Sequence, residues 1–375
     1  MRRLDVPGLE RVRDRVRRYL LRAWRLEGVE RHGGAPLTMC YAGTGLGRHY
    51  LCHLAFGDMP RITPLGRTWL WRAPELAAGT GAGLSFIETD AAGFERFAAD
   101  GDWLVPCWVD GDITHARMTA SMRRNRSVKH DVRRIHRQGF AFQVTTSVPM
   151  LEHFYDRMYR PYITNMHGPR AAYMSREAMI AKAEQVQLAL IMRDGEAVAG
   201  GLLLYEEGGV RSWSIGVLDG NRHHVSEGAV AALYYSQMNH LASLGYEVCS
   251  AGASRAFLRD GVLQFKRKWG MALTRPRVGG FWLRHRADCE GARSFLVHNP
   301  FIHRRGDRLY ALGFAAGGAP LGEAVERFSR LHDGLGVDGW AVAPVRPHAD
   351  RSGVVACGVA TGRVGSAGAV RTAVT

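Results

Sequence analysis

Paired cysteines, lysines and long apolar runs are scarce or missing in this chain of 375 residues. The six cysteines include no C-x-x-C pair, which argues against a zinc site or a disulfide framework and favours a reducing cytoplasm. Metal ligation of other kinds is not expected either, because no H-x-H or H-E-x-x-H spacing occurs. No apolar run reaches about eighteen residues, so no transmembrane helix is expected. The basic start of the chain is not followed by the apolar stretch of a secretory signal.

Positive charge is carried almost entirely by arginine, because there are only four lysines, at positions 129, 182, 266 and 268. The net charge of +15 is concentrated in two stretches. Ala116 to Gln138 has eight basic residues against one acidic residue, and Arg255 to Arg286 has nine against one. Such stretches favour a phosphate-bearing partner, such as a nucleotide, coenzyme A, tRNA, or an anionic lipid or sugar. The alternative is that they are solvated helix faces.

The length of the chain favours two domains, and an apolar fraction of 46% is enough for a sizeable core. We predict an N-terminal helix and a first lobe over residues 1–115. A second lobe with a C-terminal extension is predicted over residues 116–345. Residues 346–375 are predicted to be a disordered tail, because small residues dominate there and aromatic residues are few.

The first lobe is predicted to begin with an amphipathic helix over Gly8 to Gly28, where apolar residues recur at helical spacing. Strands are predicted over Leu37–Ala42 and Arg48–Phe56, on either side of a glycine-rich turn at residues 43–47. This turn has the G-x-G-x-G pattern of a phosphate-binding loop. It lacks the lysine of such a loop and no helix is predicted after it, so a hairpin turn is favoured. Further strands are predicted over Leu84–Glu88 and Trp103–Val109.

The stretch from Val186 to Gly270 is the most regular part of the chain. Three apolar segments separated by glycine-containing turns predict an antiparallel meander over Val186–Met192, Ala197–Tyr205 and Val210–Val217. A long helix capped by Ser226, a strand and a cationic loop are predicted next, over Ser226–Ser243, Tyr246–Ser250 and Gln264–Gly270. The other predicted elements are helices over Ala116–Gln138, Val148–Ile163, Arg176–Gln185 and Leu321–Leu331, and strands over Phe140–Thr145, Phe281–Arg286 and Arg308–Gly313.

This order of helix, helix, antiparallel meander, long helix and strand resembles the GNAT acyltransferase fold. It resembles more closely the Fem-type branch, which includes the aminoacyl-tRNA-dependent peptidyltransferases of cell-wall synthesis and the acetyltransferase-like proteins of polysaccharide clusters. The likeness covers Ala116 to Leu273. The stretches that carry it are the arginine-rich helix at residues 121–134, Ala199-Gly200-Gly201-Leu202-Leu203-Leu204, His223-His224-Val225-Ser226-Glu227-Gly228, and Gln264-Phe265-Lys266-Arg267-Lys268-Trp269-Gly270.

The resemblance implies an α/β (α+β) protein with two GNAT-like lobes, each a mixed central sheet flanked by helices. The first lobe would be a degenerate copy over residues 37–112. One stretch departs from the GNAT pattern: Arg222 to Ala229 holds only a distorted version of the pyrophosphate loop Gln/Arg-x-x-Gly-x-Gly/Ala. No tightly bound cofactor is therefore expected, and acyl-CoA or aminoacyl-tRNA would be a cosubstrate.

Acyl transfer to an amine requires an oriented donor, a deprotonated amine and stabilisation of the charge on the tetrahedral intermediate. The resemblance assigns the last role to Lys266 together with its neighbour Phe265. The alternative is that Lys266 is an exposed cation beside Arg267 and Lys268. His223 is a candidate base because histidine titrates near neutral pH. A structural role for His223, with water or substrate taking the proton, is the alternative.

The N-terminus of the helix predicted at Ser226 offers backbone N–H groups and a positive dipole end, which suit a phosphate. Arginine guanidinium groups match phosphate oxygens in a bidentate manner. The alternative is a normally capped helix and a solvated basic surface. The candidate donor-binding residues are Arg222, Ser226, Glu227, Gly228, Ala229, Arg255, Arg259 and Arg267.

The acceptor is expected near the predicted helix break at residues 165–170, where Tyr162, His167 and Tyr173 are candidates. The sequence thus predicts a cytoplasmic bacterial enzyme that transfers an acyl group from acyl-CoA, or an aminoacyl group from aminoacyl-tRNA, to an amine. A tRNA donor would be bound through the two basic stretches. The alternative outside catalysis is a degenerate GNAT-like protein that binds nucleic acid or serves in an assembly.

Overall fold

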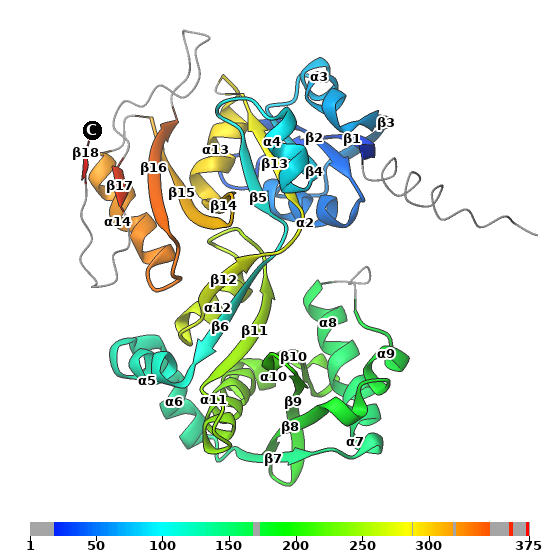
Figure 1. The fold of residues 1–375 in the computed structure, drawn as a ribbon, viewed down its shortest axis with the longest axis vertical. Coiled ribbons are helices and arrows are strands. Elements are labelled where there is room, and N and C mark those ends of the chain that lie inside the picture. Colours follow the sequence, from blue (N-terminus) through cyan, green and yellow to red (C-terminus); the bar gives the residue numbers. More distant parts are fainter. Residues whose placement is uncertain are drawn as a thin grey trace, which may run out of the picture. The chain divides into compact units, whose positions relative to one another are not determined.

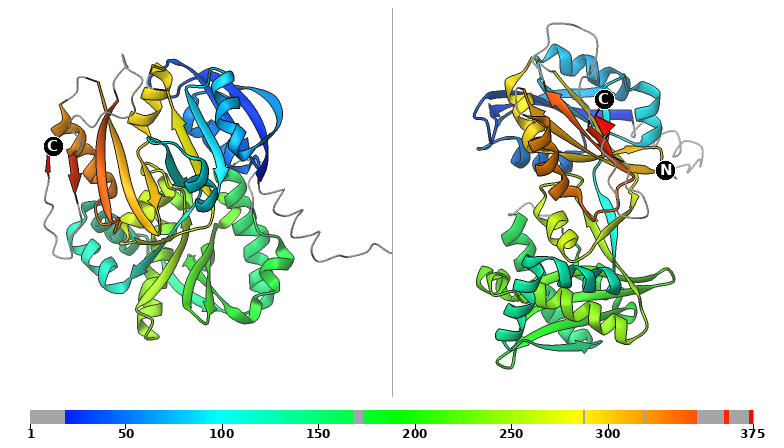
Figure 2. Two further views of the ribbon diagram at one scale, coloured as in Figure 1. Left: turned by 45° about the horizontal axis from the view of Figure 1, so that its top comes forward. Right: turned by 90° about the vertical axis from the view of Figure 1, so that its left-hand side faces the viewer.

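The computed structural model describes residues 19–167, 173–286, 288–317, 320–345, 360–362 and 373–374. The chain folds into two compact units, shown in Figures 1 and 2. Unit 1 consists of Met1–Val109, Ser254–Gln264 and Arg275–Thr375, and unit 2 of Asp110–Ala253 and Phe265–Thr274. None of the helices in the described residues is both long and apolar enough to cross a membrane.

The described residues of unit 1 contain an eleven-stranded mixed sheet in the order β18-β17-β16-β15-β14-β5-β13-β4-β2-β1-β3. The pairs β2–β4 and β15–β16 are parallel and the others antiparallel. The strands are β1 (Leu20–Val29), β2 (Pro36–Gly43), β3 (Arg61–Trp69), β4 (Leu84–Thr89), β5 (Trp103–Pro106), β13 (Gly280–His285), β14 (Phe301–Arg305), β15 (Arg308–Ala316), β16 (Gly339–Val345), β17 (Ala360–Gly362) and β18 (Ala373–Val374).

Helices cover both faces of this sheet, as β4 illustrates. Phe86 packs edge-on against Phe295 of helix α13 (Glu290–His298), with ring centroids 5.9 Å apart. The next residue, Ile87, belongs to a core cluster with Leu70 and Ala73, from the short helix η1 (Leu70–Arg72) and α3 (Ala73–Gly79). Successive residues of a strand point to opposite faces, so the two clusters lie on either side of the sheet. The other helices of unit 1 are α2 (Leu46–Ala55), α4 (Ala91–Phe97) and α14 (Leu321–His332).

Unit 2 contains, in its described residues, a seven-stranded mixed sheet in the order β12-β6-β11-β10-β9-β8-β7. Its strands are β6 (Val109–Thr114), β7 (Ala141–Thr145), β8 (Val186–Arg193), β9 (Glu196–Glu206), β10 (Gly209–Val217), β11 (Val248–Ser254) and β12 (Ala272–Pro276). Its helices are α5 (His115–Arg124), α6 (Arg126–Arg137), α7 (Val148–His153), the π-helix η2 (Phe154–Tyr159), α8 (Arg160–His167), α9 (Arg176–Ile180), the 3-10 helices η3 (Ala183–Gln185) and η4 (Leu218–Gly220), α10 (Arg222–Ser226) and α11 (Ala229–Ser243). The helix α12 (Gly261–Lys268) begins in unit 1 and belongs to unit 2 from Phe265 onward.

Two adjacent glycines let helices pack closely on both faces of β9. A Cβ at Gly200 would stand 2.9 Å from the ring of Phe154 in η2. A Cβ at Gly201 would stand 2.8 Å from the side chain of Leu233 in α11. The α11 helix thus lies against one face of the sheet and η2 against the other. The glycines of the Ala199–Leu204 motif are therefore explained by packing.

The predicted fold class is confirmed: each unit is a mixed sheet flanked by helices. The antiparallel meander is also confirmed as β8, β9 and β10. The predicted boundary at residue 115 lies close to the division at Val109. However, the segment predicted as one lobe over 116–345 is shared between the units, because β13, β14 and β15 complete the sheet of unit 1.

The helix predicted over Gly8 to Gly28 is wrong where the structure describes it, because Leu20–Val29 is the strand β1. Residues 1–18 lie outside the described part. Leu21 and Ala23 bury alternate side chains, and β1 pairs with both β2 and β3. Tertiary pairing has therefore overridden the helical spacing.

The hairpin predicted around residues 43–47 is wrong as well, because helix α2 follows the loop. Leu51, Cys52 and Ala55 bury one face of this helix. Gly45 has φ of +96°, which favours glycine at the turn into the helix. The loop is nevertheless closed by a carboxylate, since Glu88 accepts hydrogen bonds from the backbone N–H of Thr44 (2.7 Å) and from the hydroxyl of Tyr41. An anion already occupies the position that a phosphate would take.

Three further predictions need correction. The helix predicted over Ala116–Gln138 is two helices, because Asn125 stops α5 and caps α6 through its side chain. The predicted loop at Gln264–Gly270 is largely helix α12. Within the predicted disordered tail, residues 360–362 and 373–374 form β17 and β18, which extend the sheet from β16. The rest of that tail lies outside the described residues.

The buried His303 of β14 makes the stability of unit 1 depend on pH. Its side chain is 6% exposed, and burial lowers its pKa from 6.5 to about 4. The unfolded chain therefore binds a proton at this residue below about pH 6.5, while the folded chain does not until about pH 4. We expect this residue alone to lower the free energy of unfolding by about 2 kcal/mol between pH 7 and pH 5.

Urea unfolding of wild type and His303→Gln at both pH values measures this contribution. The wild type should lose more stability than the variant as the pH falls. The matched control is His130→Gln, at an exposed histidine. Equal pH dependence in wild type and His303→Gln would contradict the assignment.

Candidate active site in unit 2

Two neighbouring parallel strands part in the middle of the unit 2 sheet. Strands β10 and β11 pair only at Val210–Cys249 and Arg211–Ser250. Both strands lie wholly within the described residues and continue beyond this pairing, to Val217 and Ser254. On its other edge β10 stays paired with β9 along its whole length. Backbone groups on the facing edges of β10 and β11 are therefore left outside the ladder where the strands separate.

Lys266 places a buried positive charge at the end of β11. It lies on α12 and its side chain is 6% exposed. Its Nζ donates hydrogen bonds to the backbone carbonyls of Ala253 (2.8 Å) and Gly252 (3.4 Å). Gly252 has φ of +67°, a conformation that favours glycine. The alternative that Lys266 is an exposed cation is wrong, and its ammonium instead lies beside the parted strands.

Phe265 fixes the position of α12 on α11. Its ring packs edge-on against Tyr234, with the ring centroids 5.1 Å apart. The Nζ of Lys268 lies 5.0 Å from the centroid of the same ring. Tyr234 is buried, and burial raises its pKa above the usual range of a tyrosine. Phe265 thus orients the helix that carries Lys266.

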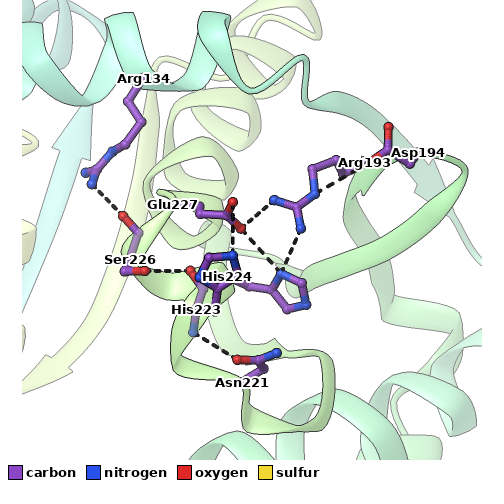
Figure 3. A network of polar contacts seen from close by, with 8 residues as sticks. All are labelled: Arg134, Arg193, Asp194, Asn221, His223, His224, Ser226 and Glu227. Atoms are coloured by element: carbon purple, nitrogen blue, oxygen red, sulfur yellow. Dashed lines mark hydrogen bonds and ion pairs between the residues drawn. The ribbon is translucent and has the colours of Figure 1, made fainter.

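The turn before α11 differs from the predicted cap. Ser226 ends the short helix α10, and Gly228, with φ of +99°, joins it to α11 at Ala229. The hydroxyl of Ser226 donates to the carbonyl of His223 at 2.8 Å, and the carbonyl of Ser226 accepts from Nη1 of Arg134 at 2.6 Å (Figure 3). The prediction that Ser226 caps the long helix is therefore wrong. No side-chain cap is present at the start of α11, where all flanking residues are described.

Glu227 is the centre of the polar network in Figure 3. Its carboxylate accepts a hydrogen bond from Arg193 and lies 3.3 Å from Nε2 of His223 and 3.8 Å from Nδ1 of His224. The hydrogen bond from Arg193 holds the pKa of Glu227 below its usual value. The backbone N–H groups of Glu227 and Gly228 already donate to His223 and Val225. This side chain is thus engaged within the protein, where its negative charge orients His223.

Asp131, which the sequence analysis did not single out, joins three elements around this turn. Its carboxylate accepts from Nη2 of Arg134 (2.6 Å) and from Nζ of Lys268 (2.5 Å). The Asp131 side chain is 5% exposed, and those of its two partners are 24% and 23% exposed. It is the single acidic residue in the basic stretch Ala116–Gln138, and this isolation is the sequence signal by which it could have been found. The carboxylate fixes α6 to α12 and aims Arg134 at the turn before α11.

A pocket of about 590 Å³ lies between α8 and the end of β10. Asn165 of α8 and Arg222 line it, together with the intervening loop at residues 219–221. Asp219 in this loop has φ of +52° and is held by Arg157 through two hydrogen bonds of 2.8 Å. The structure thus brings the predicted donor residue Arg222 next to the helix predicted to bind the acceptor.

The three candidate acceptor residues differ in their exposure and in how far the structure describes them. Tyr162 lies on α8 and is half-buried, and burial raises its pKa. Tyr173 is 43% exposed. The backbone of His167 ends α8, but its side chain and residues 168–172 lie outside what the structure describes.

The candidate donor-binding residues are divided between the two units. Arg222, the stretch Ser226–Ala229 and Arg267 belong to unit 2, whereas Arg255 and Arg259 belong to unit 1. The site in unit 2 is therefore assembled without the last two. In the described residues, no group of three or more histidine, cysteine or acidic residues is arranged to hold a metal ion.

Comparison with known proteins gives structural likeness only. No protein-family model matches the chain, and no curated protein matches it. The chain is similar to the C-terminal domain (DUF2156) of a putative lysylphosphatidylglycerol synthetase from Agrobacterium fabrum, with 16% identity over 73% of this chain and 83% of that chain and a TM-score of 0.35.

Two further solved structures are of the types that the sequence resembles. FemX has 13% identity over 70% of this chain and 88% of that chain, with a TM-score of 0.35. A tandem GNAT protein from the clavulanic acid biosynthesis pathway has 12% identity over 68% of this chain and 81% of that chain, with a TM-score of 0.29. At these values no conclusion about activity follows from the matches.

We expect Asp131→Ala to lower the free energy of unfolding by about 3 to 5 kcal/mol, because it leaves Arg134 and Lys268 without their shared carboxylate in a largely buried place. Chemical denaturation measures the change. Lys129→Ala, at an exposed position on the same helix, is the control and should change stability by no more than about 0.5 kcal/mol. A similar small effect for both variants would show that the Asp131 network does not stabilise unit 2.

Proposed function

We propose that the protein is a GNAT-type transferase that moves an acyl or aminoacyl group from an activated donor to an amine, at the parted strands of unit 2. The observation that carries the proposal is the separation of β10 from β11 after two residue pairs, with the buried ammonium of Lys266 at the end of β11. The separated strands leave a space for the donor, and Lys266 supplies a positive charge beside it. The sequence resemblance in the Gln264–Gly270 stretch supports the same assignment.

The parted strands suit an extended donor that carries amide groups. Backbone N–H and C=O groups left outside a ladder require hydrogen-bond partners. An extended chain can add to such an edge through main-chain-like hydrogen bonds. The pantetheine arm of coenzyme A has amides suitable for this purpose. An aminoacyl ester at the end of a tRNA is the other donor that we propose.

The transfer step requires a sink for negative charge and a route for one proton. The amine nitrogen attacks the donor carbonyl, the C–N bond forms, and the C–S bond of a thioester or the C–O bond of an ester breaks. The amine loses a proton, and the leaving thiolate or alkoxide gains one. Lys266 is proposed to stabilise the oxyanion of the tetrahedral intermediate, as a fixed charge in a water-poor place does most effectively.

His223 is proposed to relay the proton. Its Nε2 faces Glu227 at 3.3 Å, so a neutral ring that donates there leaves the lone pair on Nδ1 for the amine. The side chain is 68% exposed and follows directly after Arg222, which lines the 590 Å³ pocket. That pocket is proposed to receive the acceptor amine, beside the helix α8 that also carries Tyr162.

One observation favours aminoacyl-tRNA over coenzyme A as donor. In ordinary GNAT enzymes the loop before the long helix binds the pyrophosphate, but here Glu227 places a negative carboxylate directly before the start of α11. A tRNA would instead meet the arginines of α5 and α6. The same observation supports a non-catalytic nucleic-acid-binding or assembly role as the second candidate function.

Binding of acetyl-CoA, charged tRNA and uncharged tRNA to the purified protein, over roughly 50 to 300 mM salt, separates these donors. Saturable coenzyme A binding with little salt dependence supports the acyl-CoA version. Preference for charged tRNA, with binding that weakens steeply as salt rises, supports the aminoacyl version. Binding of neither donor would contradict the proposal.

We expect Lys266→Gln to reduce single-turnover transfer from the bound donor by roughly a hundred-fold or more, because the transition state loses a preorganised charge. Donor affinity should change only a few-fold. Lys182→Gln, at a half-buried lysine that hydrogen-bonds to Gln185, is the control and should retain full activity. Circular dichroism and thermal melting establish that both variants are folded. Unchanged transfer by folded Lys266→Gln would remove Lys266 from the mechanism and favour the non-catalytic alternative.

A further inference from the structure

Arg255 in unit 1 is a half-buried cation that no described carboxylate contacts directly, although Asp260 acts on it electrostatically. Among the described residues it makes no ion pair within 4.0 Å, and its only hydrogen bond runs from Nη1 to the carbonyl of Cys107 at 3.3 Å. Burial lowers its pKa, although arginine remains charged. A charge removed from water without a counter-ion is costly to the folded state. The position therefore requires a physical explanation.

Two aromatic rings hold the guanidinium of Arg255 in place. Its Cζ lies 3.7 Å from the ring centroid of Trp108 and 4.3 Å from that of Tyr50. Stacking of this kind stabilises a cation through the ring quadrupole. Of the N–H groups of the guanidinium, the Cys107 carbonyl accepts from one. The others form no hydrogen bond with any described residue, so they are available to a ligand.

Tyr50 adds a second group that lacks a partner. Its hydroxyl is buried, and no described residue forms a hydrogen bond with it. Burial raises the pKa of Tyr50 far above neutral, so the phenol keeps its proton and acts as a donor. A buried hydroxyl with no partner normally costs stability and is rare in proteins. A buried donor and an unpaired cation thus occur together.

The nearby acids do not neutralise this pair. Asp260 caps α12, its Oδ1 accepting from the backbone N–H groups of Val262 (3.1 Å) and Leu263 (3.0 Å). Glu88 is engaged by Tyr41 and Thr44. The thiol of Cys107 has its pKa raised to about 12 by burial and stays neutral. The neutral donors to Asp260 and Glu88 leave both carboxylates charged, but neither lies within 4.0 Å of the guanidinium, and Trp108 beside it is 39% exposed.

We propose that Arg255 and Tyr50 form a binding site for an oxyanion, a carboxylate or phosphate group of a ligand of unit 1. A guanidinium edge receives two oxygens of such a group, as bidentate arginine–carboxylate and arginine–phosphate pairs do. The Tyr50 hydroxyl donates to one of the same oxygens. The site belongs to unit 1 and stands independently of the transfer chemistry proposed for unit 2.

The side-chain Nε–H resonance of Arg255, followed by NMR in the full-length protein, tests this site. It is assigned from the spectrum of Arg255→Lys. Inorganic phosphate, pyrophosphate and acetate are titrated at constant ionic strength, with sodium chloride as the reference. The proposal predicts a saturable shift with at least one oxyanion and none with chloride. Saturation by phosphates alone or by acetate alone identifies which oxyanion the site takes. No saturable shift with any of the three would overturn the proposal.

Tyr50→Phe is the decisive variant, because it keeps the ring and removes only the hydroxyl. We expect the oxyanion affinity to fall roughly ten-fold or more, as for loss of a hydrogen bond to a charged group. Thermal stability should be unchanged or higher, because a buried unpartnered hydroxyl has been removed. Arg61→Lys, at an exposed arginine elsewhere in unit 1, should bind the oxyanion as the wild type does. Unchanged affinity in Tyr50→Phe, or a marked loss of stability, would assign the hydroxyl to the fold instead.

Discussion

The separation of β10 from β11 is the constraint on which the rest of unit 2 depends. Once two parallel strands part after two residue pairs, their facing edges need new hydrogen-bond partners. One partner comes from the chain itself, since Lys266 donates to the carbonyls at the end of β11. The helix that carries Lys266 must then be held firmly, and Phe265 and Lys268 hold it against α11 and α6.

The candidate site of each unit contains a buried charge. In unit 2, the buried carboxylate of Asp131 pairs with Arg134 and Lys268, and these two cations offset the cost of its burial. In unit 1, Arg255 is stabilised by aromatic rings, which do not compensate its charge. The charges of the Asp131 network are paired within the protein, so a structural role explains them. Among the described residues the guanidinium of Arg255 has no ion-pair partner and the Tyr50 hydroxyl has no hydrogen-bond partner, so we infer that a ligand binds there.

The sequence predicted best those elements whose signals are local. The meander β8–β10 follows from apolar runs separated by turns such as Asp194-Gly195, in which Asp194 adopts φ of +52°. The start of α9 at Arg176 was likewise predicted, and the Ser175 side chain caps it there. The strand β1 and the helix α2 were missed, because their conformation is decided by pairing with distant strands and by the packing of Leu51 and Ala55 on the sheet.

The candidate site was predictable only in part. The motif around Lys266 identified the residue, but its burial against Gly252 and Ala253 depends on a strand that precedes it by more than ten residues. The start of the long helix was misplaced, because Ser226 looks like a cap while Gly228 is the residue that turns the chain. Asp131 could have been noticed as the single acid in a basic stretch, but its partner Lys268 is distant in the sequence. Tyr50 could not be recognised, since nothing in its local sequence shows what lies opposite it in space.

The central claim is that a donor occupies the parted edges of β10 and β11, and residue-resolved amide hydrogen exchange tests it most directly. Amides of β10 beyond Arg211 that point away from β9 should exchange rapidly in the free protein, because no ladder protects them. Saturating acetyl-CoA or charged tRNA should slow the exchange of these amides and of those at the end of β11. Donor binding that leaves both segments unprotected would contradict the account and place the donor elsewhere.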